Sequence, residues 1–259
     1  MKIKLHSQYN HFPTVTTSDD DYDIELWNDG RIWEYISYKP RYPRASALLI
    51  EPRSIMPETY AMVEKNYAMF DHIFTHDGQL LRYLPNAKPI IYWRDYELHD
   101  EVKTKDISFI CGNKNMCLAH NIRMQLAQHL QDKVDVLGDW NGGERVSTRD
   151  AYAPYKFAIV IENYADHYWM TEKILNAFAN KTVPIYLGAT NIYQFFERHG
   201  IIEVNNIWNL IDTVSVLKEM GINNEYNRRR VSINNNYKKV QQFKNFEDWF
   251  INNYEEIIC

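Results

Sequence analysis

Short runs of apolar residues, each bounded by Pro, Asp or Gly, recur along the first hundred residues. Runs of four to six apolar residues with such borders are typical of buried parallel strands. The pattern predicts strands at residues 2–5, 23–27, 47–50, 72–75 and 89–92, with a helix at 57–70 between two of them. Residues 94–106 are polar and without periodicity, which indicates a linker between two domains.

A second series of strands and helices follows this linker. Strands are predicted at 107–111, 134–137, 157–161 and 183–187, and helices at 119–131, at 169–180 and from 208 onward. Strands that alternate with helices predict parallel sheets flanked by helices. We therefore expect an α/β protein with two Rossmann-like domains facing a cleft. Their expected bounds are 1–105 and 106–240, with the last segment, 241–259, helical and able to pack back on the first domain.

The composition is that of an ordinary globular enzyme. Of the 259 residues, 45% are apolar and 24% are charged, which allows a substantial core. The net charge of −5 argues against general nucleic-acid binding, which usually needs a basic protein. The cysteines show no framework spacing, which suits a reducing compartment. No run reaches the roughly 18 apolar residues of a spanning helix. We expect a soluble cytoplasmic protein, with contact at a membrane surface left open.

Residues 155–188, YKFAIVIENYADHYWMTEKILNAFANKTVPIYLG, are the most informative segment. The segment predicts a hydrophobic strand, a polar turn that opens with Glu162-Asn163, a helix that carries Thr171-Glu172-Lys173, and a second strand. A helix N-terminus offers unpaired N–H groups and partial positive charge, which suit a phosphate. Lys173 adds a full charge, and Glu172 is able to accept hydrogen bonds from ribose hydroxyls. The segment therefore predicts half of a nucleotide-diphosphate site.

The same segment resembles the donor-binding segment of the α1,3-fucosyltransferases, glycosyltransferase family 10. The pattern Y-K-F-x(4)-E-N-x(7)-T-E-K-x(3)-A-x(5)-V-P-I-x-x-G matches without a gap. Tyr164 departs from the family's Ser, and Trp169 from its Tyr, with Tyr168 beside it to supply a hydroxyl. The resemblance implies the two-domain GT-B architecture, a GDP-sugar donor, expected to be GDP-fucose, and inverting transfer to a hydroxyl of a glycan acceptor.

The resemblance also implies which side chains bind the donor. Lys173 is the first cation for the departing diphosphate. The second is expected after a Gly-rich stretch, where Asn141-Gly142-Gly143-Glu144-Arg145 fits, and Arg145 is favoured over Arg149. Glu172 is assigned to the ribose. The remaining donor contacts are assigned to Asn163, Tyr168 and Trp169. Protein cations replace a metal in this scheme, so neither a metal nor another cofactor is expected.

The general base is expected in the N-terminal domain, where the family carries a glutamate just after a strand in a Glu-x-x-x-Pro-like context. Glu51, at the end of a predicted strand and immediately before Pro52, fits this context. The alternatives are Asp77, Asp95 and Glu97, which follow later strands.

Two other features have ordinary explanations. The run Asp19–Asp23 contains an Asp-x-Asp spelling but is most simply a solvated loop. Cys111 and Cys117 have no matching second pair, which disfavours zinc.

Two rival functions stay open. One rival function is a related enzyme for another nucleotide sugar, which the departure at Trp169 permits. The other is a non-catalytic nucleotide- or glycan-binding protein.

Overall fold

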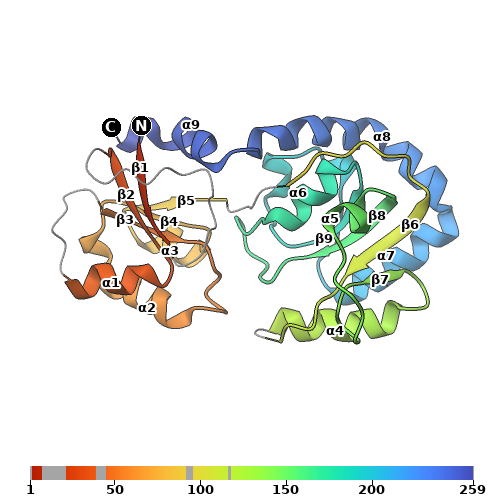
Figure 1. The fold of residues 1–259 in the computed structure, drawn as a ribbon, viewed down its shortest axis with the longest axis horizontal. Helices are drawn as coiled ribbons and strands as arrows, with labels where there is room; N and C mark the ends of the chain where they lie inside the picture. The colour runs from red at the N-terminus through yellow and green to blue at the C-terminus, as the bar shows by residue number, and fades with distance from the viewer. Residues whose placement is uncertain (1, 8–21, 39–44, 92–95, 116–117, 259) are drawn as a thin grey trace. The chain divides into compact units, whose positions relative to one another are not determined.

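The computed structural model describes residues 2–7, 22–38, 45–91, 96–115 and 118–258 (Figure 1). The chain divides into two compact units. The N-terminal unit comprises residues 1–94, 166–169 and 242–259, and the C-terminal unit comprises 95–165 and 170–241. The Asp19–Asp23 run lies largely outside the described residues. Among the helices that are described, none is long and apolar enough to cross a membrane.

The N-terminal unit holds a parallel sheet whose strands lie in chain order, β1-β2-β3-β4-β5. These are β1 (Ile3–His6), β2 (Ile24–Asn28), β3 (Ala45–Leu49), β4 (Ile73–Thr75) and β5 (Ala87–Pro89). The connecting helices are α1 (Arg31–Tyr38), α2 (Pro57–Asn66) with the short η1 (Tyr67–Met69), and α3 (Gly78–Tyr83). Because parallel crossovers are right-handed, connections that advance in one direction place their helices on one face. Ile32, Tyr60 and Leu80 of these helices share one buried cluster with Leu49.

The other face of this sheet is covered by α9 (Phe246–Ile258). Ile73 belongs to the cluster under the crossover helices, so Phe74, the next residue of β4, points to the opposite face. The Phe74 ring lies 4.9 Å from that of Phe250 and 5.0 Å from that of Tyr254. Figure 1 shows α9 across the sheet from α1 and α2. A sheet with its crossover helices on one face needs cover for the other, and the end of the chain supplies it.

The C-terminal unit holds a second parallel sheet, with the order β10-β9-β8-β6-β7. Its strands are β6 (Lys105–Ile110), β7 (Asp135–Leu137), β8 (Tyr155–Ile161), β9 (Val183–Leu187) and β10 (Ile202–Glu203). β8 is buried along its whole length between β6 and β9. The chain runs outward from β6 to β7 and then returns to place β8 on the other side of β6. The strand order therefore reverses between β6 and β8, the place where open α/β sheets bind ligands.

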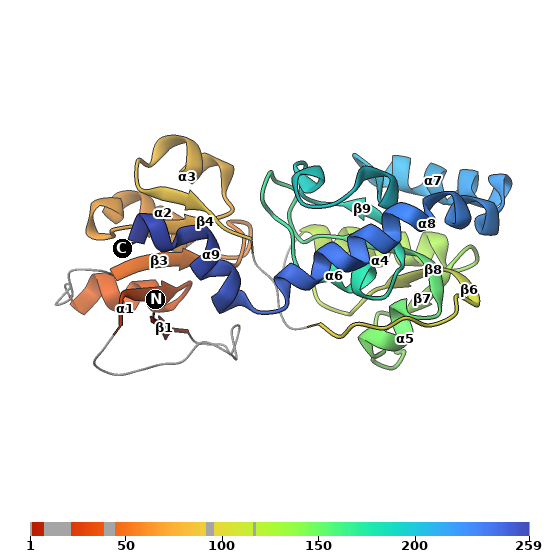
Figure 2. The same cartoon turned by 90° about the horizontal axis from the view of Figure 1, so that it is seen from above.

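Helices surround this second sheet. They are α4 (Leu118–Leu130), α5 (Thr148–Tyr152), α6 (Glu172–Ala179), α7 (Ile207–Met220) and α8 (Ile222–Lys239). The short turns are η2 (Ile192–Gln194), η3 (Arg198–Gly200) and η4 (Val240–Phe243). α8 lies across β8 and α6 (Figure 2). The polar stretch before β6 packs on this unit, because His99 N donates to Ala179 O at 2.9 Å.

The predicted α/β class with two parallel sheets is confirmed, but several elements differ. The helix predicted from 169 begins at Glu172, because Thr171 is its N-cap. The strand predicted at 89–92 lies at 87–89. The sequence patterns missed α1, α3 and α5, which have eight, six and five residues, too few to show a helical period. Local caps start the two shortest: Asp77 accepts from Leu80 N, and Ser147 accepts from Asp150 N.

Candidate functional site

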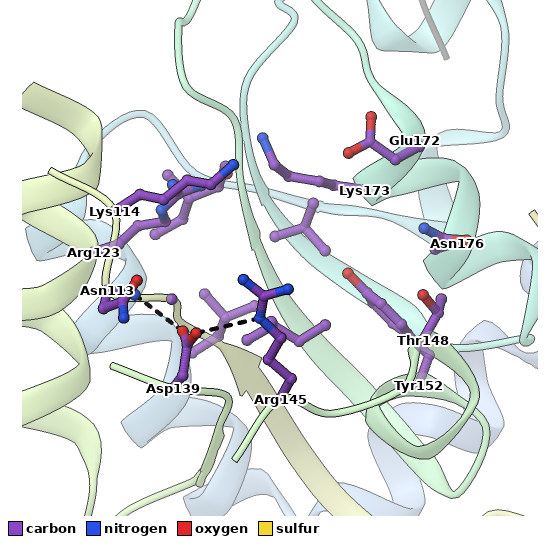
Figure 3. Close-up of a pocket in the computed structure, with 15 residues that line it drawn as sticks. Asn113, Lys114, Arg123, Asp139, Arg145, Thr148, Tyr152, Glu172, Lys173 and Asn176 are labelled. Atoms are coloured by element: carbon purple, nitrogen blue, oxygen red, sulfur yellow. Dashed lines mark hydrogen bonds and ion pairs between the residues drawn. The ribbon is translucent and has the colours of Figure 1, made fainter. Parts of the chain in front are cut away.

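A cavity of about 460 Å³ lies where the strand order of the C-terminal unit reverses (Figure 3). Its walls are the ends of β6 and β8, the loops after β6 and β7, and the first turn of α6. Its polar lining side chains are Asn113, Lys114, Arg123, Asp139, Arg145, Thr148, Tyr152, Glu172, Lys173 and Asn176. The sheet topology thus brings together side chains from across some sixty residues of sequence.

Positive charge dominates this cavity. Among its lining residues, Lys114, Arg123, Arg145 and Lys173 are cationic, against the carboxylates of Asp139 and Glu172. Figure 3 shows the four cationic groups converging from different elements. The buried His120 reflects the resulting field. Burial, together with the charges of Arg123, Lys173 and Lys114, lowers the pKa of His120 to about 4. A field that opposes a proton on a neighbouring imidazole favours an anion.

Lys173 is held in place by the buried carboxylate of Glu162, directly after β8. The Glu162 side chain is 0% exposed, and its Oε2 lies 2.9 Å from Lys173 Nζ. The same carboxylate accepts from Thr171 N at 3.0 Å and Thr171 Oγ1 at 2.7 Å. Asn163 Oδ1 lies 3.4 Å from Lys173 Nζ. A Cβ at Gly188 would come within 2.4 Å of the Tyr186 hydroxyl and 2.6 Å of Glu162 Cγ, so glycine leaves space for both side chains. The segment from Glu162 to Lys173 therefore folds into one local unit.

Replacing Thr171 with Val is expected to destabilise this unit. The hydroxyl caps α6, accepting from Lys173 N at 3.4 Å, and also donates to Glu162. Its loss removes a cap and leaves a buried carboxylate with one donor fewer, a cost of about 1–2 kcal/mol in the free energy of unfolding. GDP affinity is expected to fall several-fold, because Glu162 then orients Lys173 less well. Denaturant unfolding and GDP titration measure the two effects.

The matched control is Asn206→Ala, which removes the side-chain cap of α7, a helix that does not line the cavity. It is expected to lose similar stability and keep its affinity for GDP. Equal GDP affinity in Thr171→Val and wild type contradicts the role given to this hydroxyl.

Arg145 comes from the loop after β7, and its side chain is 91% exposed. Its Nε lies 3.5 Å from Asp139 Oδ2, while Asp139 Oδ1 accepts from Asn113 N at 3.1 Å. Asp139 thus ties the loop of Arg145 to the loop after β6. Arg149, the alternative, pairs with Glu101 at 2.6 Å and lines a neighbouring cavity instead. The geometry favours Arg145 for the cation-lined cavity.

Tyr168 and Trp169 do not line this cavity. Residues 166–169 group with the N-terminal unit. There Trp169 is 3% exposed, and its ring lies 4.2 Å from that of His76. The donor contacts expected of these two aromatic residues stay predictions.

Glu51, the expected base, lies two residues after the end of β3 in the N-terminal unit and is half-buried. Side chains hold its backbone at both ends. Its N–H donates to Asp29 Oδ1 and Oδ2, each at 3.3 Å, and its carbonyl accepts from Tyr60 Oη at 2.8 Å. These contacts fix the position from which the Glu51 side chain extends.

The alternative bases fit less well. Arg53 donates to both oxygens of Asp77, at 2.9 and 3.0 Å, and Asp77 also caps α3. Burial opposes the charge of Asp77, but the hydrogen bonds from Arg53 and Leu80 N outweigh it and lower the pKa of this carboxyl. Such a carboxylate is a weak base. Glu97 is 85% exposed in the C-terminal unit. Asp95 lies outside the described residues.

The family model described as "Glycosyltransferase family 10 (fucosyltransferase) C-term" matches residues 101–258. The chain belongs to glycosyltransferase family 10. Over 96 residues it is 32% identical to an alpha-(1,4)-fucosyltransferase of Arabidopsis thaliana, which covers 35% of this chain and 24% of the plant protein. Over 77 residues it is 27% identical to the alpha-(1,3)-fucosyltransferase FucT of Helicobacter pylori, which covers 29% and 16%. The matches therefore span about a quarter or less of these relatives.

Solved structures agree with this assignment at the level of fold. An α1,3-fucosyltransferase with GDP superposes with a TM-score of 0.55 at 14% identity, covering 94% of this chain and 89% of that chain. An α-glucosyltransferase in complex with UDP and DNA gives 0.54 at 10% identity, covering 93% and 80%. The GT-B architecture implied by the sequence is confirmed.

Sequence reasoning on this family 10 chain missed Lys114 and Arg123. Lys114 follows β6, and Arg123 lies on α4 with its Nη1 3.4 Å from Ile161 O at the end of β8. The signal in the sequence was that loops follow the predicted strands at 107–111 and 157–161. These two loops can be placed at one site only when it is known that β6 lies beside β8.

Proposed function

We propose that the protein is an inverting glycosyltransferase that moves L-fucose from GDP-fucose to a hydroxyl of a glycan acceptor. The observation that carries the proposal is the cation-lined cavity at the strand reversal, with Lys173 fixed there by buried Glu162. The named relatives are fucosyltransferases, and solved α1,3-fucosyltransferases of the same fold hold GDP and GDP-fucose.

The donor diphosphate is expected to bind in this cavity. Lys173 and Arg145 offset the negative charge that grows on the diphosphate as the glycosidic bond breaks. Lys114 and Arg123 line the same cavity and add to its positive field. Because negative charge on the diphosphate grows as the bond breaks, these cations stabilise the transition state more than the ground state. Glu172 is assigned to the ribose. These groups supply the charge without a metal.

Glu51 is proposed as the general base. It takes the proton from the acceptor hydroxyl as the hydroxyl oxygen attacks the anomeric carbon. The bond from that carbon to the diphosphate oxygen breaks, and its electron pair leaves with GDP. One displacement of this kind inverts the configuration at the anomeric carbon.

The test is GDP release from GDP-fucose, GDP-mannose, UDP-glucose and UDP-galactose, with and without N-acetyllactosamine or lactose. Release from GDP-fucose alone, faster with a disaccharide, is the expected result. Release from another donor overturns the choice of fucose and keeps the transferase. GDP binding without turnover of any donor points to a binding protein and contradicts the proposal.

The setting of the reaction also stays a proposal. Sparse cysteines without a disulfide spacing fit work in a reducing compartment such as the cytoplasm. The glycan acceptor and peripheral contact with a membrane surface are further expectations.

A further inference from the structure

Asp29 is a buried carboxylate with an unusual backbone, next to the candidate base. It follows β2, is 3% exposed, and has a φ of 43° in the left-handed region. Its N–H donates to Leu48 O at 3.0 Å, and its carbonyl accepts from Ile32 N at 3.0 Å. A non-glycine residue in this region costs of order 1 kcal/mol or more. The contacts of Asp29 indicate why the protein has a strained, buried acid at this position.

The Asp29 carboxylate is directed at the peptide units that carry Glu51. Its Oδ1 accepts from Ile50 N at 2.8 Å, and both oxygens lie 3.3 Å from Glu51 N. On the other side of the same residue, Tyr60 donates to Glu51 O at 2.8 Å, and His76 Nε2 lies 3.1 Å from the Tyr60 hydroxyl. Two side chains, Asp29 and Tyr60, therefore fix the backbone of Glu51, which lies in an irregular segment, and His76 supports the Tyr60 hydroxyl.

The Asp29 carboxyl ionises only near neutral pH. Burial is the main cause that raises its pKa to about 7, and the charge of Glu51 adds to burial, against the N–H groups of Ile50 and Glu51. At neutral pH the Asp29 carboxyl is therefore partly ionised. The titratable groups around this network are Glu51 after β3, Tyr60 on α2, and His76 and Asp77 after β4.

We propose that Asp29 is a positioning residue for the catalytic base: its carboxyl accepts from the N–H groups of Ile50 and Glu51 and so holds the segment that carries Glu51. This inference rests on the proposed role of Glu51. Holding a reacting group in its productive direction is worth a large rate factor, because small displacements are costly.

The test is Asp29→Asn, which keeps the shape, keeps one acceptor oxygen, tolerates the left-handed backbone and removes the charge. We expect kcat to fall about tenfold, with GDP affinity unchanged. The amide nitrogen of Asn replaces one of the two oxygens that face Glu51 N, so the hold on this segment weakens. The acceptor KM is expected to stay unchanged, whereas a merely structural loss raises it as well. Asp71→Asn, at an exposed position of the same unit, is the matched control.

Tyr60→Phe is the second variant, since it removes the hydroxyl that donates to Glu51 O and leaves Asp29 in place. It is expected to lower kcat several-fold with the acceptor KM unchanged. Wild-type kcat in both variants, while Glu51→Gln is inactive, overturns the positioning role and leaves the proposed function standing. Wild-type turnover by Glu51→Gln overturns the base itself, and with it this inference.

Discussion

Glu51→Gln is expected to lower the rate of sugar transfer about 10³-fold. Glutamine keeps the size of the side chain and its place after β3, but it cannot take a proton from the acceptor hydroxyl. The backbone contacts from Asp29 and Tyr60 do not involve the Glu51 side chain, so the fold is expected to survive. GDP affinity is expected to stay unchanged, because the cation-lined cavity belongs to the C-terminal unit. Steady-state transfer and GDP titration measure the two quantities.

The matched control is Glu58→Gln, the same chemical change at an exposed position of α2. It is expected to behave as wild type in both measurements. Full transfer activity in Glu51→Gln shows that another group is the base. Loss of GDP binding together with activity points instead to a disturbed fold, which a thermal melt detects.

Lys173→Ala is expected to weaken GDP binding about 100-fold, or by roughly 3 kcal/mol. The variant removes the cation that the local unit directs into the cavity, and it leaves buried Glu162 without its partner at 2.9 Å. The unpaired carboxylate then adds a negative charge beside the diphosphate. Both effects lower the affinity for GDP, and catalysis is expected to fall further, because the charge on the diphosphate grows in the transition state. Calorimetric titration with GDP measures the first effect.

Lys156→Ala is the control for general loss of charge in the C-terminal unit. Lys156 is also ion-paired, with Nζ 3.0 Å from Asp106 Oδ1, but it does not line the cavity. Its removal is expected to leave the GDP affinity within about twofold of wild type. If Lys173→Ala and Lys156→Ala bind GDP equally well, the donor site does not include Lys173.

The sequence alone determined the local unit around Lys173. The groups that build it, from Glu162 to Lys173, lie within 11 residues, and their spacing depends on one strand end and one helix start. Contacts so close in sequence follow from local geometry, so the pattern identified the segment, while the pairing of Lys173 with Glu162 came from the structure. Parallel sheets were predictable for a related reason, since the apolar runs of β3 and β8 fit strands buried on both faces.

Other features depended on the tertiary structure. Lys114 and Arg123 enter the cavity only because the strand order reverses between β6 and β8, which no local pattern records. The helix α5 forms at a Ser147 cap and is too short to show a period. Asp29 reads in sequence as a loop residue, yet it contacts Glu51 across 22 positions. Sequence patterns predict contacts between residues that are close in the chain. Contacts between distant segments depend on strand order and packing, which form only when the whole chain folds.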